Sequence, residues 1–258
     1  MLHTFTAMTY NLWGEWELDR RLPALRAFLA QRSPDVLGVQ ELNPRSRAAL
    51  DEVLPHHHRV RDDTRPWQFR SNLWWDSRKF RATDHGFSDV KISQRNPDGG
   101  LHWVMLESLL DPSAPPLLLT ATHLTSAGHK LELETHVTPR VEQAEAVAHE
   151  INRLAGTDAA SLLCTDLNDS AIPMWKFYDA GFREPFGYLG RHSPATFPTL
   201  PRVDRPQPWD RVQTTAKAID WLFFNGPLEP KLAEVSDFFL DGVPGSDHKP
   251  VSAAFVLG

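Results

Sequence analysis

Cysteine is almost absent from this chain of 258 residues, which contains only Cys164. A single cysteine cannot form an internal disulfide, and this scarcity is typical of proteins in a reducing compartment. Because Cys164 lies within an apolar run, we expect it to pack in the core.

Long apolar segments are also lacking. No apolar stretch of the chain approaches the roughly 20 residues that span a bilayer. Residues 1–6 lack the charged segment, followed by an apolar one, that begins a secretory signal. These absences predict a cytoplasmic protein without a membrane span.

Several catalytic motifs are missing. The chain has no His-Glu-x-x-His or Cys-x-x-Cys spacing, no Gly-x-Ser-x-Gly turn and no Gly-x-x-x-x-Gly-Lys loop. The consecutive histidines at 56–58 suggest a zinc site, but neighbouring side chains of an extended segment alternate in direction. We therefore do not expect a histidine-ligated zinc enzyme.

Basic charge is limited as well. The net charge of -6 argues against a protein that coats nucleic acid through a broad basic surface. Between His56 and Arg81, however, seven Lys or Arg residues stand against three Asp. This stretch either faces a phosphate-bearing substrate or forms a solvated face.

The patterning predicts a single α/β domain over residues 1–258, since 41% of the residues are hydrophobic and no composition break or repeat occurs. Apolar spacing predicts helices over 18–32 and 140–154. The segment 194–208 contains five prolines and reads as a rigid loop, and 96–100 reads as a turn. Between the helices, consecutive strand-like runs imply antiparallel pairing over 72–75, 80–90, 101–109 and 117–122.

Polar side chains stand at or near the ends of six apolar runs. Buried carboxylates at such places are costly unless they are paired or metal-bound, so packing alone gives no reason for the pattern. The set comprises Asn11, Glu41, His123, Asp166 with Asn168, Asp220, and Asp247 with His248.

These residues occur in short motifs whose order is Tyr-Asn, Gln-Glu, Thr-His-Leu, Asp-x-Asn, Ile-Asp-Trp and Ser-Asp-His. In that order, from Thr9 to His248, the chain resembles the endonuclease/exonuclease/phosphatase superfamily of metal-dependent phosphoesterases. The resemblance implies a four-layer α/β sandwich, in which helices flank two stacked mixed β-sheets. It also implies hydrolysis of a phosphodiester or phosphomonoester.

That reaction requires a cation on the non-bridging oxygens, an oriented water and a group that stabilises the leaving oxygen. Glu41 offers the hard oxygen ligand that Mg²⁺ prefers, with Mn²⁺ as an alternative. We expect Asn11 beside it as an amide ligand or phosphate contact. Asp247 is expected to join the metal shell or its waters.

The resemblance implies the remaining roles. Asp166 would activate the attacking water while Asn168 holds the phosphate, and both can face one pocket because they are two residues apart in an extended segment. Asp220 would keep His248 cationic against the phosphate. The superfamily usually has Gly where Thr165 precedes the acid, so the local turn is expected to differ.

Three further residues are candidates near the substrate. By resemblance, His123 would donate toward the phosphate or the leaving group. Arg140 begins the helix after that strand, where it either pairs with the acids of the site or stays solvated. Trp13 belongs to a group of aromatic residues in predicted loops that can stack on bases or meet an acyl chain; the others are Trp16, Trp67, Phe197 and Trp209, whereas Trp74, Trp75, Trp103 and Trp221 are expected in the core.

The substrate class stays open at this stage. A nuclease or nucleic-acid end-processing enzyme acting on DNA or RNA is favoured by the basic stretch and the loop aromatics. A phosphatase or phosphodiesterase of small-molecule or lipid phosphates is favoured by the acidic net charge. A catalytically silent scaffold is the alternative of another class. We expect a monomer.

Overall fold

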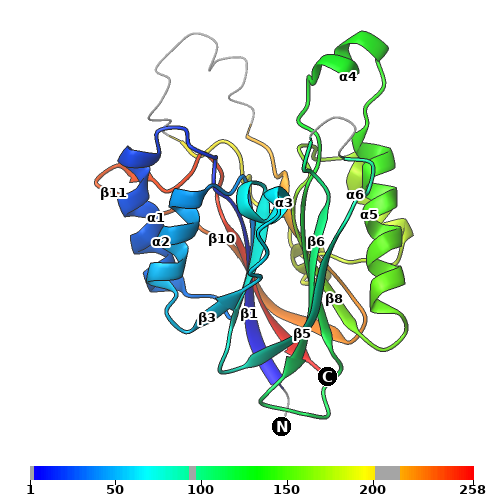
Figure 1. Cartoon of the computed structure of the whole chain (residues 1–258). Coiled ribbons are helices and arrows are strands. Elements are labelled where there is room, and N and C mark those ends of the chain that lie inside the picture. Colours follow the sequence, from blue (N-terminus) through cyan, green and yellow to red (C-terminus); the bar gives the residue numbers. More distant parts are fainter. Residues whose placement is uncertain (1–2, 93–96, 201–215) are drawn as a thin grey trace.

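Two stacked β-sheets form the centre of the molecule (Figure 1). The structure is a computed structural model that describes residues 3–92, 97–200 and 216–258. In the first sheet the strand order is β10-β13-β1-β2-β4-β3, and in the second it is β5-β6-β7-β8-β9. The first sheet comprises β1 (His3–Asn11), β2 (Val36–Gln40), β3 (His57–Arg59), β4 (Ser71–Asp76), β10 (Leu228–Val235) and β13 (Val251–Leu257). The second comprises β5 (Phe80–Ser88), β6 (Leu101–Ser108), β7 (Leu117–His123), β8 (Ala160–Asp166) and β9 (Asp220–Asn225).

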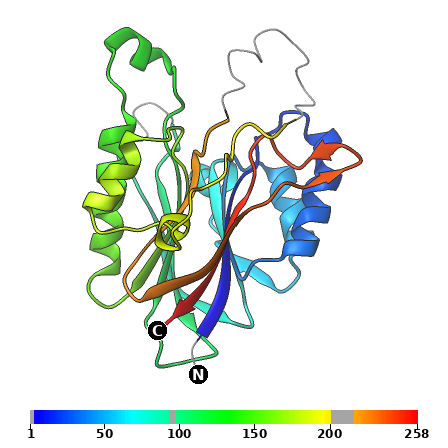
Figure 2. The ribbon, with the colours of Figure 1, turned by 180° about the vertical axis from the view of Figure 1, so that it is seen from behind.

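Helices cover the outer face of each sheet (Figures 1 and 2). On one side lie α1 (Leu18–Arg32) and α2 (Pro44–Val53), and on the other lie α5 (Arg140–Ala155) and α6 (Ile172–Asp179). This arrangement confirms the expected four-layer sandwich. Shorter elements are α3 (Arg65–Phe69), α4 (Lys130–Thr135), α7 (Pro185–Tyr188) and the hairpin of β11 (Phe239–Leu240) and β12 (Val243–Pro244). None of the helices in the described ranges is both long and apolar enough to cross a membrane.

The core has one layer between the sheets and one under each helical face. Helix α1 buries Leu25, Phe28 and Leu29 on the face that its apolar spacing predicts. Helix α2 was not predicted, because it buries few large apolar side chains. Its start is nevertheless encoded locally, since Asn43 and Ser46 form a reciprocal capping box.

The two sheets approach each other closely where β2 passes β8. A Cβ atom at Gly38 would lie 2.4 Å from the Cβ of Cys164, so only glycine fits there. Gln40 adds a polar link, since its Nε2 donates to the Cys164 carbonyl at 3.2 Å. Cys164 is fully buried, as expected, and burial raises the pKa of its thiol to about 12.

Strand pairing departs from the prediction at one point. The runs that became β5, β6 and β7 do pair antiparallel. The expected pairing of the 72–75 run with them is wrong, because β4 pairs with β2 and β3 in the other sheet. The chain crosses from the first sheet to the second after Asp76. A short connection without a helix can either join two strands of one sheet or cross to the other sheet, so the sequence did not distinguish the two. The expected 96–100 turn and 194–208 loop lie partly outside the described residues.

Candidate active site

Strand direction brings the candidate residues to one edge of the sandwich. Strands β1 and β2 run parallel, as do β7 and β8, so the ends of each pair meet at the same edge. Register then pairs His123 with Asp166 and Asp166 with Asp220 across neighbouring strands. Asp247 and His248 enter from the loop before β13. The start of β1 and the end of β13 lie at the opposite end of the sandwich (Figure 1).

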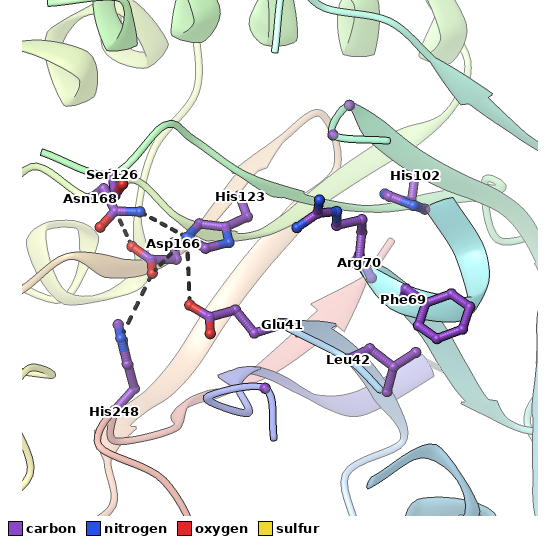
Figure 3. A pocket seen from close by; sticks show the side chains of 14 residues that line it. Glu41, Leu42, Phe69, Arg70, His102, His123, Ser126, Asp166, Asn168 and His248 are labelled. Carbon is purple, nitrogen blue, oxygen red and sulfur yellow. Dashed lines mark hydrogen bonds and ion pairs between the residues drawn. The ribbon is translucent and has the colours of Figure 1, made fainter. Parts of the chain in front are cut away.

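A cavity of about 320 Å³ opens at this edge. Five of the candidate residues line it, and Figure 3 shows them grouped on one side: Glu41, His123, Asp166, Asn168 and His248. Asn11, Asp220 and Asp247 are buried and do not line the cavity. All three contact residues that do: Asn11 bonds to Glu41 and Asp166, Asp220 pairs with His248, and Asp247 Oδ1 lies 3.9 Å from His248 Nε2.

Asn11 links the two sheets at the floor of the cavity. Its Nδ2 donates to Glu41 Oε1 at 3.1 Å and to Asp166 Oδ2 at 2.9 Å. Its Oδ1 accepts from the Trp13 backbone N–H at 2.9 Å. Since both ends of the amide are engaged, Asn11 orients the two carboxylates from its place at the end of β1.

Asp166 is almost completely buried and is held by a second donor. Its Oδ1 accepts from the Asn168 N–H at 2.7 Å, which fixes the turn after β8. The backbone of Asn168 is left-handed, with φ of 51°, a conformation that Asn tolerates. Thr165 lies within β8 and pairs with Trp221, so this β-branched residue has regular extended backbone. The left-handed conformation occurs at Asn168, two residues after Asp166.

His123 faces these groups from β7. Its Nε2 lies 2.7 Å from Asn168 Nδ2, 3.4 Å from Asp166 Oδ2 and 4.0 Å from Glu41 Oε1. The Asn168 amide also donates to the Leu124 carbonyl at 3.0 Å, which fixes its orientation. The imidazole therefore lies between the carboxylates of both sheets.

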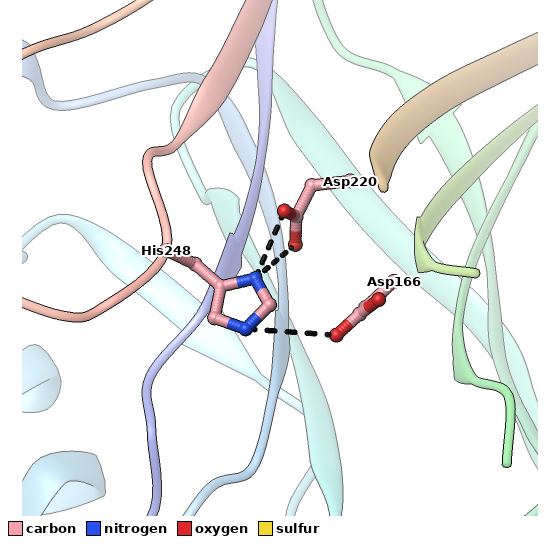
Figure 4. Close-up of side chains that lie close together, drawn as sticks. All are labelled: Asp166, Asp220 and His248. Atoms are coloured by element: carbon pink, nitrogen blue, oxygen red, sulfur yellow. Dashed lines mark hydrogen bonds and ion pairs between the residues drawn. The ribbon is translucent and has the colours of Figure 1, made fainter. Parts of the chain in front are cut away.

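His248 and Asp220 form a buried pair beneath the cavity (Figure 4). The two carboxylate oxygens lie 3.0 and 2.9 Å from Nδ1, so Nε2 is directed toward Asp166, whose Oδ2 is 3.9 Å away. Burial alone lowers the pKa of His248, but the charge and hydrogen bond of Asp220, with Asp247 and Asp166, raise it well above 6.5. These acids therefore favour the protonated form of the imidazole.

Thr196 and Ser246 secure this pair, and only Ser246 stands in a predicted motif. Thr196 Oγ1 accepts from the Asp220 N–H at 3.1 Å, and this hydroxyl also lowers the pKa of Asp220, which burial raises. Ser246 Oγ donates to the Asn11 carbonyl at 2.8 Å and accepts from the His248 N–H at 3.2 Å. Nothing in the local sequence around Thr196 indicates its role, because the contact is long-range.

Two groups of side chains offer ligands for a cation. Ligand atoms of Asp166, Asp220 and His248 all lie within 4.8 Å of one another. A protonated His248 cannot ligate a cation, and its Nδ1 is already engaged by Asp220. Glu41 fits better, because it lines the cavity and, among the described residues, its carboxylate accepts one hydrogen bond, from Asn11 Nδ2 to Oε1. A carboxylate with a free oxygen suits a hard cation.

Arg140 and Trp13 lie outside the cavity lining. Arg140 is buried, paired with Glu132 at 2.8 Å and with Asp169 at 3.2 Å, so it pairs with a neighbour of the site. The Trp13 ring stacks against the buried Arg21, whose guanidinium lies 5.3 Å from the ring centre. Each contacts a neighbour of the cavity, Arg140 through Asp169 and Trp13 through the Asn11 amide.

Arg21 was not among the candidates. Its guanidinium donates to the carbonyls of Trp13, Gly14 and Gly245, which joins the loop after β1 to the loop that carries His248. It lies on the buried face of α1. A charged residue at a core position of an amphipathic helix is the signal that could have revealed it.

The aromatic residues that were expected in loops differ in their exposure. The expectation of an exposed Trp67 is wrong, because this residue belongs to α3 and packs edge-on against His102 in the interior. Trp16 is 66% exposed, and the Phe197 ring lies 4.8 Å from that of His248. Trp209 lies outside the described residues. The strand tryptophans are in the core, as expected: Trp74, Trp75 and Trp221 are buried and Trp103 packs against the core.

The basic stretch of 56–81 is largely neutralised by acids. Five of its seven cations form ion pairs, as Arg59, Arg65, Arg78, Lys79 and Arg81 do with Asp51, Asp98, Asp76, Asp35 and Glu107. His57 contacts the Pro34 carbonyl whereas His58 packs beside Trp75, so the two imidazoles diverge. Most cations of the stretch are therefore held by acids, and strand β4 within it is buried.

Known structures share this fold. D. rerio TDP2 in complex with a single-strand DNA product superposes with a TM-score of 0.77 at 19% identity, and 98% of each chain is covered. A mannosyl-6-phosphatase from Bacteroides thetaiotaomicron gives 0.75 at 18% identity, covering 98% of this chain and 100% of that one. ANGEL2, a 2′,3′-cyclic phosphatase, gives 0.67 at 16% identity, with 99% and 96% covered. At these identities the likeness establishes the fold.

Sequence comparison supplies the family. No curated protein matches the chain significantly. The family model described as "Endonuclease/Exonuclease/phosphatase family" matches residues 8–248, nearly the whole chain and every motif residue from Asn11 to His248. With the two-sheet fold and the acid and imidazole groups gathered at one edge, the chain belongs to the endonuclease/exonuclease/phosphatase family of phosphoesterases.

Proposed function

We propose that this protein is a Mg²⁺-dependent hydrolase of phosphate esters, able to use Mn²⁺, in which a water activated by Asp166 attacks phosphorus in line. The observation that carries the proposal is the buried pair of Asp220 and His248, which directs a cationic imidazole at the same cavity that Asp166 and Glu41 line. A carboxylate and a cation facing one space are suited to water activation and to charge stabilisation, respectively.

Asp166 is the proposed general base. Hydrogen bonds from Asn11 and from the Asn168 N–H hold one oxygen each, so the carboxylate cannot rotate. A fixed carboxylate at the cavity wall accepts a proton from a water without the entropic cost of being oriented first.

His248 is the proposed phosphate contact. Its Nδ1 proton is held by Asp220, which leaves Nε2–H to donate to a phosphate oxygen as negative charge develops. Asn168 and His123 would contact the phosphate or the leaving oxygen from the opposite sheet, since both line the cavity.

Glu41 is the proposed principal metal ligand. Asn11 orients it, and Asp247, whose Oδ1 lies 3.9 Å from His248 Nε2, would contribute through the ion's waters. The bound cation would supply positive charge on the non-bridging oxygens. Arg140 and Trp13 are proposed to position the site: Arg140 fixes the Asp169 side of the β8 turn, and Trp13 holds the Asn11 amide through its N–H.

We favour a DNA or RNA strand end as the substrate. The support is the shared fold with D. rerio TDP2, whose structure contains a single-strand DNA product. A small-molecule phosphate is the second candidate, since a cavity of about 320 Å³ lies at the lower end of the range for small-molecule sites and a sugar phosphatase shares the fold equally well.

A hydrolysis panel tests the proposal. Oligonucleotides, nucleotides, sugar phosphates and phospholipids are incubated with Mg²⁺, Mn²⁺ or EDTA, and products are measured for wild type and Asp166→Asn. We expect one activity that EDTA abolishes and that Asp166→Asn reduces by about 10²- to 10⁴-fold in kcat. Asp63→Asn, a change at an exposed carboxylate, is the matched control. Full turnover by Asp166→Asn would remove the proposed base.

A further inference from the structure

The cavity extends beyond the catalytic groups. On the side away from His248, Figure 3 shows a second part that is formed where α3 meets β4. Its lining comprises Leu42, Phe69, Arg70, Ser71, Gly99, Gly100 and His102. No carboxylate occurs among these lining residues, whereas the catalytic side contains Glu41 and Asp166. The second part therefore has a different charge character from the first.

Arg70 is the distinctive residue of this second part. Its side chain extends into the cavity in the direction of His123 (Figure 3). Within the described residues its guanidinium forms no ion pair, and its buried Nε has no hydrogen-bond partner. Five other cations of the same stretch pair with acids, so an unpaired one inside a cavity is an exception that packing does not explain.

An unsatisfied buried donor indicates a missing acceptor. Leaving such a group unpaired is costly, above all when it is charged, so native structures rarely retain one. Glu41 and Asp166 line the same cavity but do not pair with Arg70, which is therefore held apart from the catalytic carboxylates. An anion of the substrate is an acceptor that would complete this donor set, since a guanidinium fork matches a phosphate.

We propose that Arg70 binds a second anionic group of the substrate, next to the phosphate that is hydrolysed. This inference rests on the proposed function and narrows its substrate class to esters that carry two phosphates or a phosphate chain. Phe69, 42% exposed and adjacent, lines the same part of the cavity and would contact the unit between the two phosphates. The second anion is either the neighbouring backbone phosphate of a nucleic-acid strand or the second phosphate of a small bisphosphate.

Matched substrate pairs test this role. Thymidylyl-thymidine with and without a 5′-phosphate forms the nucleic-acid pair, and mannose 6-phosphate with mannose 1,6-bisphosphate forms the small-molecule pair. For wild type, Arg70→Gln and Arg70→Lys, kcat/KM is measured on both members of each pair with Mg²⁺. Arg61→Gln, at an exposed arginine of the same stretch that does not line this cavity, is the control.

In the pair that contains the substrate, we expect wild type to prefer the member with two phosphates. Arg70→Gln should reduce that preference about 10- to 100-fold, mainly through KM, because a charge-assisted hydrogen bond is lost. Arg70→Lys should recover part of the preference through its charge, and Arg61→Gln should retain all of it. The pair that responds identifies the source of the anion.

The failures are distinguishable. If wild type hydrolyses neither pair nor any member of the broader panel, the proposed function is wrong and this inference falls with it. If wild type is active but Arg70→Gln changes both members of a pair by the same factor, or changes neither, the second-anion role alone is refuted. Titration calorimetry with thymidine 3′,5′-bisphosphate and thymidine 5′-monophosphate in EDTA repeats the comparison without catalysis; equal affinity changes in Arg70→Gln again refute the role.

Discussion

Removing the charge of Asp220 tests the electrostatics of this site most directly. Both of its oxygens lie within hydrogen-bond distance of His248 Nδ1, at 3.0 and 2.9 Å, and both residues are buried. Asp220→Asn retains the size and one acceptor oxygen but removes the charge. The burial that lowers the pKa of His248 is then opposed mainly by Asp247 and Asp166, so the imidazole loses its proton at a lower pH.

The magnitude follows from the lost interaction. A hydrogen bond to a charged group contributes about 1.5–3 kcal/mol, and each ~1.4 kcal/mol is a factor of ten. At a pH where only wild-type His248 is protonated, we expect kcat/KM of Asp220→Asn to fall about 10- to 100-fold. At acidic pH the loss is smaller, because the variant's imidazole is protonated there too. The alkaline limb of the pH–rate profile therefore moves to lower pH.

Two assays together test this reasoning. Kinetics between about pH 5 and pH 10 locate the limb, and a histidine NMR titration reports the protonation of His248 without catalysis. The control is Asp237→Asn, which removes an exposed carboxylate that pairs with Lys249 at 2.7 Å, next to His248 in the chain. If the limb and the NMR titration of Asp220→Asn both match wild type, the pair does not set the charge of the imidazole.

Other predictions test the metal ligand, the sheet contact and an ion pair. Glu41→Gln should raise the Mg²⁺ concentration needed for half-maximal activity, and an unchanged metal titration would move the ligand role elsewhere. Gly38→Ala should lower the free energy of unfolding by about 1–3 kcal/mol through overpacking, and Cys164→Gly in the same chain should restore part of it; additive effects in urea denaturation would contradict the contact. Hydrogen bonds from Arg78 lower the pKa of Asp76 from 3.8 to about 2, so its stabilising contribution is present above 3.8 and is lost as the pH falls through about 2. Asp76→Asn should therefore lower stability by about 1–2 kcal/mol at pH 7, after allowance for the exposed Arg78, and by less at pH 3; an equal loss at both pH values would contradict the pairing.

Local chemistry made much of the fold predictable. The helix 18–32 and the strand 36–40 have the predicted bounds, because apolar spacing and the break at Pro34 are encoded in adjacent residues. Edge elements were harder to predict. Strand β10 contains Pro230 and a bulge, which interrupt the alternation that normally indicates a strand. Its pairing with β13 stabilises a strand that the alternation of its own residues does not predict.

The sequence by itself determined the identity of the catalytic groups. Each motif combines a polar residue with an apolar run, and both parts can be read within a few positions. Asn11, Asp166 and His248 meet in one site because of the parallel and antiparallel order of the strands near them. The family resemblance implied that they meet, and the strand register shows how.

Only the tertiary structure decided how these groups interact. The raised pKa of His248, the burial of Trp67 and the pairing of Arg140 all depend on residues far away in sequence. The same holds for Arg70, which has no ion-pair partner among the described residues. Burial, hydrogen bonding and charge act over a few ångströms in space, and the packing of the two sheets sets those distances. The sequence names the chemical groups, whereas the fold sets the charge state, partner and exposure of each.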